Sequence, residues 1–155
     1  MQPPFRIQTP RLAEYPALVK LWDASVRATH HFLPQAYIDQ IKPLIADHYL
    51  YLVMLACAVD RQRRIAGFVG VSHGRVEMLF IDPARRGQGV GKLLLWHAVE
   101  QFNATELDVN EQNPQALGFY LRQGFEVVGR SDFDGLGQPY PLLHLRLNHA
   151  QARIA

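Results

Sequence analysis

The chain has 155 residues, 48% of them hydrophobic and 19% charged, with a formal net charge of +2 at neutral pH. This length suits one compact domain over residues 1–155, and the hydrophobic content is sufficient for a sizeable core, which excludes a mainly disordered chain. The 16 basic and 14 acidic residues are mixed along the sequence. Without the basic stripe that a phosphate backbone requires, nucleic acid is not expected as a partner.

The longest apolar stretch, from Tyr49 to Val59, is much shorter than the roughly 20 residues of a membrane-spanning helix, and we interpret it as a buried strand. The N-terminal residues lack a cationic region followed by an apolar core, so neither a signal peptide nor a lipid anchor is expected. Cys57, the only cysteine, fits a small buried side chain better than a nucleophile or half of a disulfide. These features predict a cytoplasmic protein without membrane association.

The N-terminal half alternates between strand and helix patterns. A strand is predicted at 5–8, followed by an amphipathic helix whose apolar positions are Leu18, Leu21, Trp22 and Val26. A second helical segment, around Ile38, Ile41 and Ile45, is expected to be interrupted by Pro43, because proline lacks a backbone donor. Three strands at 51–59, 64–71 and 76–81 follow, and their short connections favour an antiparallel meander.

The C-terminal half begins with a helical pattern from Gly89, in which Val90, Leu93, Leu94 and Ala98 are expected to form one buried face. A strand at 105–109 precedes a helix that Asn113 can cap and that Gly124 can end. Strands at 125–129 and 142–147 complete the sheet. The intervening segment 130–141 is a candidate substrate-side loop, and the tail from Asn148 to Ala155 is expected to be coil.

The segment 76–91 is the most specific part of the sequence, since it orders a strand, a basic glycine-rich loop and a helix. Helix N-termini present backbone N–H groups without intrahelical acceptors, and Gly87, Gly89 and Gly91 would let a diphosphate approach them. The alternative is a tight turn. A P-loop is excluded because Arg86 and Leu93 stand where it needs glycine and Ser or Thr, and the glycine spacing excludes the dinucleotide fingerprint.

This segment also carries a family resemblance. Arg86-x-x-Gly89-x-Gly91 after a strand matches the acetyl-CoA signature of the GNAT superfamily, Gln/Arg-x-x-Gly-x-Gly/Ala, and the segment from Asn110 to Phe125 resembles its second motif. The chain is therefore similar to GNAT N-acetyltransferases over about residues 76–125. The segments Val26–Leu33 and Asp134–Leu143 resemble more narrowly the bacterial YjaB-type acetyltransferases.

The resemblance implies an α/β fold with a mixed, mostly antiparallel twisted sheet of six or seven strands and about four helices. It also implies direct acetyl transfer from acetyl-CoA to a primary amine of a small molecule or peptide, without a metal, by a monomer or homodimer. The cofactor-binding residues that it implies are Leu79, Phe80, Ile81, Arg86, Gly87, Gln88, Gly89, Val90, Gly91, Lys92, Asn113 and Phe119. The cations Arg85, Arg86 and Lys92 can equally be ordinary solvated residues.

By the same resemblance, Tyr120 would be the general acid that protonates the departing coenzyme A thiolate, and the alternative is an aromatic that packs beside Phe119. Glu77 is the leading candidate for the base that deprotonates the amine, although a solvent-facing glutamate fits its position too, and His73 is a weaker candidate. His30 and His31 fit surface or capping roles. An acetyl-CoA-binding sensor without turnover is the alternative function, which Tyr120 disfavours.

The loop at 130–141 holds Asp132 and Asp134. We expect these two carboxylates to help attract a cationic acceptor, because opposite charges concentrate a ligand near a site.

Overall fold

The computed structural model describes residues 3–149, which contain seven strands and four α-helices. They divide between Ala104 and Thr105 into two compact units, which are taken in turn. Among these residues, no helix has both the length and the apolar character needed to span a membrane. Most of the predicted coiled tail, residues 150–155, lies outside the described part of the chain.

The first unit is built on a four-stranded antiparallel sheet in the order β1-β2-β3-β4. The strands are β1 (Phe5–Gln8), β2 (Met54–Asp60), β3 (Ile65–Ser72) and β4 (Arg75–Ile81). Strands β2 to β4 follow one another in the chain and in the sheet, so the predicted antiparallel meander is confirmed.

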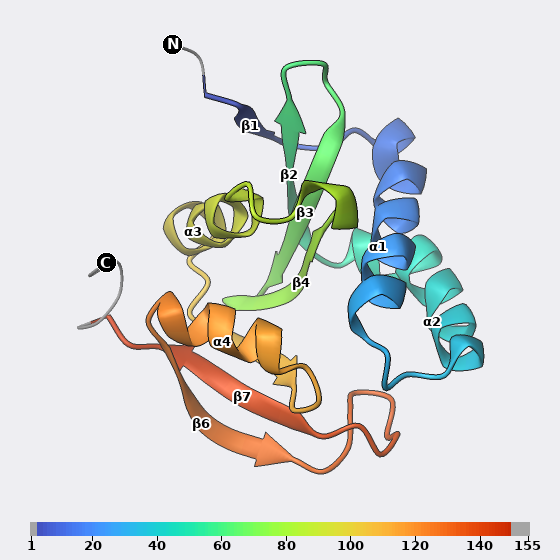
Figure 1. Ribbon diagram of the computed structural model, residues 1–155. Helices are drawn as coiled ribbons and strands as arrows, with labels where there is room; N and C mark the ends of the chain where they lie inside the picture. Colours follow the sequence, from blue (N-terminus) through green and yellow to red (C-terminus); the bar gives the residue numbers. More distant parts are fainter. Residues whose placement is uncertain (1–2, 150–155) are drawn as a thin grey trace. The chain divides into compact units, whose positions relative to one another are not determined.

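Helices cover both faces of this sheet. Helices α1 (Tyr15–Thr29) and α2 (Gln35–Asp47) lie on one face and α3 (Val90–Phe102) on the other, as Figure 1 shows. The core below α1 and α2 includes Leu18, Trp22, Val26, Ile38, Ile45, Leu55, Cys57, Val59, Phe68 and Met78. Because the sheet is buried on both faces, β2 and β3 are continuous runs without polar side chains up to their last residues, Asp60 and Ser72, rather than alternating.

Helix α2 runs through Pro43, so the expected interruption is wrong. Pro43 is exposed, and its ring removes a single backbone donor from the helix. On the other face, Ile38 and Ile45 are buried in the core shared with α1, on either side of the proline. Their burial holds the two halves of the helix in line.

Two further expectations in this unit are wrong. Residues Tyr49–Tyr51 form a short 3-10 helix, with Tyr51 60% exposed, and the strand begins only at Met54. Leu93 is 39% exposed. The buried arc of α3 comprises Val90, Leu94, Leu95, Trp96 and Ala98, and at about 100° per residue Leu93 falls outside it.

The second unit contains a three-stranded antiparallel sheet in the order β5-β7-β6. Its strands are β5 (Glu106–Asn110), β6 (Phe125–Ser131) and β7 (Leu142–Leu147), and helix α4 (Pro114–Arg122) packs against β5 and β6. Leu107, Val109, Phe125, Leu145 and Leu147 are its buried apolar residues.

The predicted ends of α4 are confirmed. The side-chain oxygen of Asn113 accepts a hydrogen bond from the Ala116 N–H at 3.2 Å, and Pro114 opens the helix. After its last turn, Gly124 adopts a φ of +100°, in the left-handed region that favours glycine.

Candidate active site

Strand β4, which carries the predicted thioester and base positions, has a β-bulge at Glu77. Gly70 of β3 faces Met78 and Val71 faces Val76, so Glu77 is an extra residue in the register. A bulge bends its strand and changes the direction of neighbouring side chains. Glu77 is exposed, and Leu79, two residues later, is half-buried. Phe80 and Ile81 are half-buried as well.

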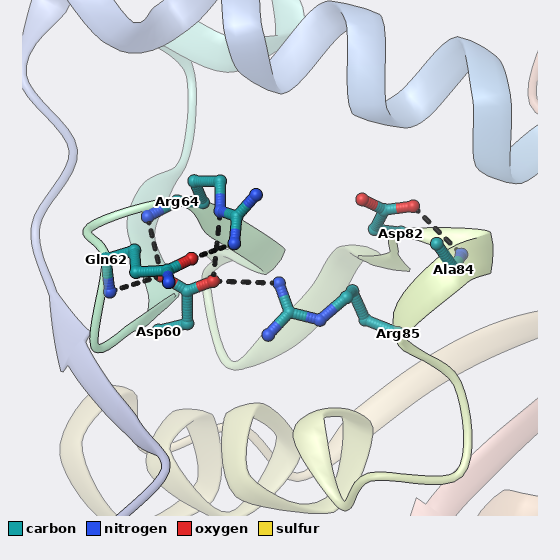
Figure 2. A network of polar contacts seen from close by, with 6 residues as sticks. All are labelled: Asp60, Gln62, Arg64, Asp82, Ala84 and Arg85. Atoms are coloured by element: carbon teal, nitrogen blue, oxygen red, sulfur yellow. Dashed lines mark hydrogen bonds and ion pairs between the residues drawn. The ribbon is translucent and has the colours of Figure 1, made fainter.

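The loop after β4 has the backbone that its glycines predict. Asp82 starts a short 3-10 helix, Pro83–Arg85, by accepting a hydrogen bond from the Ala84 N–H at 3.0 Å (Figure 2). Beyond it, Gly87 and Gly89 have φ values of +74° and +83°. A Cβ at either glycine would meet nothing within 4 Å. Backbone conformation rather than crowding therefore requires glycine, and the space beside both is open.

Helix α3 starts at this loop without a side-chain cap. Gly89 is its N-cap, and the first intrahelical bond runs from the Leu93 N–H to the Gly89 carbonyl at 3.0 Å. The N–H groups of the first turn, including those of Val90 and Gly91, therefore have no intrahelical acceptor, and the helix dipole adds partial positive charge. Gln88, Arg86 and Lys92 are exposed around them. This arrangement can bind a diphosphate through the backbone.

Arg85, the third cation near the loop, is held by an ion pair instead. Its Nη1 donates to Asp60 Oδ2 at 3.0 Å (Figure 2). The guanidinium also lies 5.2 Å from the centre of the Phe5 ring. Asp60 is 9% exposed and also accepts the N–H groups of Gln62 and Arg64. The hydrogen bond from the Arg64 N–H is the largest cause that lowers the pKa of Asp60. The hydrogen bond from the Arg85 side chain lowers this pKa further. Arg86 and Lys92 are thus the better placed to meet phosphate charge.

His30 ends α1, which confirms a capping role, since its N–H donates to the Val26 carbonyl at 2.7 Å. The Thr29 hydroxyl donates to Ser25 and so accepts from His30 Nδ1, each at 2.7 Å. Burial, with a smaller contribution from the charge of Arg86, lowers the pKa of His30 to about 4. The imidazole is therefore neutral at neutral pH.

His31 and His73, the other two histidines considered from the sequence, are both exposed. His31 is exposed on the surface, as one interpretation of the sequence predicts. His73 is also exposed, at a φ of +51°, and its Nδ1 lies 2.9 Å from the Ser72 hydroxyl.

In the second unit, Tyr120 of α4 belongs to an aromatic cluster formed by residues of α4 and β6. Its ring centre lies 5.2 Å from that of Phe119 and 6.0 Å from that of Phe125. Burial raises the pKa of the phenol above its ordinary value. The hydroxyl therefore keeps its proton at neutral pH, so this side chain combines packing with the capacity to donate. Asn113 uses its side-chain oxygen for the helix cap.

The two aspartates of the loop between β6 and β7 make different contacts. Asp134 accepts the N–H groups of Leu136 at 3.0 Å and Gln138 at 2.8 Å, so its carboxylate organises the loop. Asp132 is 73% exposed and pairs with Arg130, which also bonds Glu111. The expectation that both attract an acceptor therefore fits Asp132 better.

Sequence reasoning missed one cluster of polar side chains. Asp108 Oδ1, from β5, lies 2.6 Å from His144 Nδ1, and His144 Nε2 lies 2.6 Å from Ser131 Oγ. No local motif links these residues, because they are far apart in the sequence. Their one available signal was register, which places Asp108 opposite His144 once β5 and β7 are paired.

Cys57 is buried as predicted, and burial raises the pKa of its thiol to about 11. Residues 3–149 contain no cluster of three or more His, Cys, Asp or Glu side chains that could hold a metal ion.

Known proteins match this chain over most of its length. The model of the acetyltransferase (GNAT) domain family matches residues 23–137. The peptidyl-lysine N-acetyltransferase YjaB of Salmonella typhimurium is 45% identical over 139 residues, which cover 90% of this chain and 95% of that protein. The peptidyl-lysine N-acetyltransferase YiaC of Escherichia coli is 29% identical, over 79% of this chain and 84% of that protein.

Solved structures agree with this assignment. Apo YjaB from Escherichia coli, 42% identical, superimposes with a TM-score of 0.83 over 92% of this chain and 96% of that one. The PaiA N-acetyltransferase of Thermoplasma acidophilum, solved with coenzyme A, shares the fold at 18% identity, with a TM-score of 0.73 over 93% of this chain and 99% of that one. The expected α/β fold class is thereby confirmed. The chain belongs to the GNAT family and is an N-acetyltransferase.

Proposed function

We propose that this protein acetylates the side-chain amine of lysine residues in proteins, with acetyl-CoA as the acetyl donor. The observation that carries the proposal is the 45% identity to a peptidyl-lysine N-acetyltransferase across nearly the full length of both chains. Acceptor-binding loops vary more than the scaffold that carries them, so the choice of acceptor is the part that most needs a test.

The cofactor half of the site is proposed to lie in the first unit. Backbone N–H groups from Gly87 to Gly91 would bind the pyrophosphate, with Arg86 and Lys92 beside it. Two observations support this assignment, namely the positive φ values of Gly87 and Gly89 and the helix start that no side chain caps. The backbone of Leu79, Phe80 and Ile81 would bind the thioester carbonyl and the pantetheine arm, and Asn113 and Phe119 would contact the cofactor from α4.

The chemistry moves protons at the nitrogen and at the sulfur. A base takes one proton from the ammonium, and the neutral amine attacks the thioester carbonyl carbon to form a C–N bond. The C–S bond breaks, and the thiolate leaves with the electron pair of that bond. The nitrogen loses a second proton as the amide forms, which balances the proton that the thiolate takes up. Tyr120 would give its proton to the thiolate, for which a phenol that stays protonated is suited. Glu77 is the candidate in the first unit for the base that takes the ammonium proton, and the bulge at this position supports it.

A thiol-release assay with purified protein tests the proposal. We expect coenzyme A release that depends on a lysine-containing peptide, together with a mass increase of one acetyl group on the lysine. Release with small amines but not with any lysine peptide would contradict the acceptor. Acetyl-CoA binding without release would favour the sensor alternative. The cytoplasmic location and the monomeric or homodimeric state stay predictions.

A further inference from the structure

Three strands of the second unit bring an acid, an imidazole and an alcohol into a line. Asp108 (β5) and His144 (β7) are directly opposed in the antiparallel register, and Ser131 ends β6 on the other side of β7. Asp108 Oδ1 to His144 Nδ1 and His144 Nε2 to Ser131 Oγ each measure 2.6 Å. Both ring nitrogens are thus bonded, so the imidazole plane is fixed.

The backbone makes room for this imidazole. A bulge in β6 brings Gly129, rather than Val128, opposite His144. A Cβ at Gly129 would approach His144 Cδ2 to 3.3 Å, a contact that is tighter than usual. A glycine at this register position therefore lets the ring lie against β6 while its Nε2 reaches the Ser131 hydroxyl.

The order of groups sets the direction in which protons can move. An ionised Asp108 only accepts, so His144 Nδ1 donates to it, and Nε2 is left with the lone pair that accepts from Ser131. The Ser131 oxygen then still has lone pairs for an outside donor. This is the arrangement by which a carboxylate orients an imidazole and the imidazole takes a proton from a hydroxyl.

The cluster is open to solvent at the base of the candidate substrate-side loop. The side chains of His144 and Asp108 are 34% and 30% exposed. In the structure β6 continues through Ser131, two residues further than predicted, so the loop comprises residues 132–141 and β7 begins after it at Leu142. The flanking charges on the same strands, Glu106 and Arg146, pair with each other at 3.6 Å. Asp108 is therefore the charge that directly contacts the imidazole.

We propose that Ser131, His144 and Asp108 form a proton relay that deprotonates the ammonium group of the acceptor. The ammonium gives a proton to Ser131 Oγ as the Ser131 hydroxyl proton passes to His144 Nε2, and Asp108 stabilises the resulting imidazolium. The amine becomes neutral, and the imidazolium later releases the proton to water. The relay rests on the proposed acetyl transfer to an amine, and it supplies a route distinct from Glu77.

The test compares the pH dependence of turnover in wild type and in His144→Gln, with saturating acetyl-CoA and a lysine peptide. We expect a loss of about 10²-fold near neutral pH, as for a general base. This loss shrinks toward about pH 10, where a lysine amine is increasingly neutral without help. Asp108→Asn and Ser131→Ala should lose turnover in the same pH-dependent manner, and coenzyme A affinity should stay unchanged in all three.

Arg146→Gln is the matched control, because it alters a charged side chain on the strand of His144 but outside the relay. We expect it to keep wild-type turnover. An unchanged pH profile in His144→Gln, or an equal loss at every pH, would overturn the relay. The relay would also be overturned if the fall of turnover at low pH disappeared in Glu77→Gln but remained in His144→Gln.

The relay and the proposed acceptor can fail separately. If the wild type acetylates a small amine but no lysine peptide, the lysine proposal fails and the same variants test the relay on that amine. If the wild type acetylates lysine and His144→Gln matches it, the relay fails and the acceptor stands. Wild-type protein that turns over no amine contradicts both.

Discussion

The Asp60 carboxylate and the Arg85 guanidinium meet at 3.0 Å although 25 positions separate them in the chain. Asp60 ends β2, and Arg85 ends the 3-10 helix that leads into the glycine loop. The same guanidinium lies over the Phe5 ring of β1. The pair therefore ties the start of the proposed phosphate loop to the edge of the first sheet.

We expect Asp60→Asn to lower the thermal stability of the protein in a pH-dependent way. The pKa of Asp60 is held below its usual 3.8, so the ionised carboxylate favours the folded state. This stability is present above about pH 4 and is lost as the pH falls through the lower pKa of the folded state. Thermal unfolding followed from about pH 7 down to pH 3 should show the two proteins converging at the acid end.

The control for this change is Arg64→Gln, which keeps the backbone N–H that bonds Asp60 and removes an exposed guanidinium whose Nε lies 3.5 Å from Asp60 Oδ2. It should cost less stability than Asp60→Asn. A constant difference between wild type and Asp60→Asn at every pH would contradict the ionic explanation.

Gly89→Asp should abolish coenzyme A binding, measured by calorimetry, while the fold is retained. The substitution brings a carboxylate into a site proposed for a diphosphate, and it forces a side chain onto a φ of +83°. Gly137→Asp is a matched control, since Gly137 has a φ of +75° and similarly open surroundings. The Gly137→Asp variant introduces the same charge and the same backbone strain, but on the loop between β6 and β7. Equal affinity in the two variants would contradict the phosphate-loop assignment.

Tyr120→Phe should lower turnover by about 10²-fold or more, because a general acid contributes about 10²–10⁴-fold. The ring and its contacts with Phe119 and Phe125 are kept, so coenzyme A affinity should change little. Steady-state kinetics and calorimetry separate these effects. Lost affinity with normal turnover at saturation would make Tyr120 a binding residue instead.

The lowered pKa of the half-buried His30 predicts acid sensitivity of the fold. Its pKa is about 4 in the folded protein against 6.5 ordinarily, so the unfolded chain binds a proton first as the pH falls. Stability should therefore decrease from about pH 6.5 down to pH 4, by up to roughly 3 kcal/mol for this shift. His30→Gln should flatten this part of the stability curve. His31→Gln, which changes the exposed neighbour, should leave it as in the wild type.

The elements with strong local signals could be predicted from the sequence. The Asn113 cap, the proline after it and Gly124 define both ends of α4, because caps act through neighbouring backbone groups. The glycines at 87 and 89 likewise indicate a loop whose backbone needs glycine. The resemblance to GNAT proteins added the type of fold and the identity of the cofactor.

The remaining features depend on tertiary packing. Burial of Ile38 and Ile45 keeps α2 intact through Pro43, which no local pattern indicates. The bulge at Glu77 is a property of the pairing between β3 and β4. Similarly, Asp108, His144 and Ser131 come together only when three strands have taken their register, so a search for short motifs passes over them.

The isolation of Cys57 inside the first unit simplifies the biochemistry of this enzyme. Colorimetric reagents that trap free sulfhydryls report the coenzyme A released at each turnover, and a thiol that ionises only near pH 11 adds little background to that signal. A cysteine engineered at Gly135, in open space on the loop between β6 and β7, would also be the one readily labelled position, since the only natural cysteine, Cys57, is buried. We expect a fluorophore attached there to report acceptor binding if this loop borders the acceptor, as the sequence predicts.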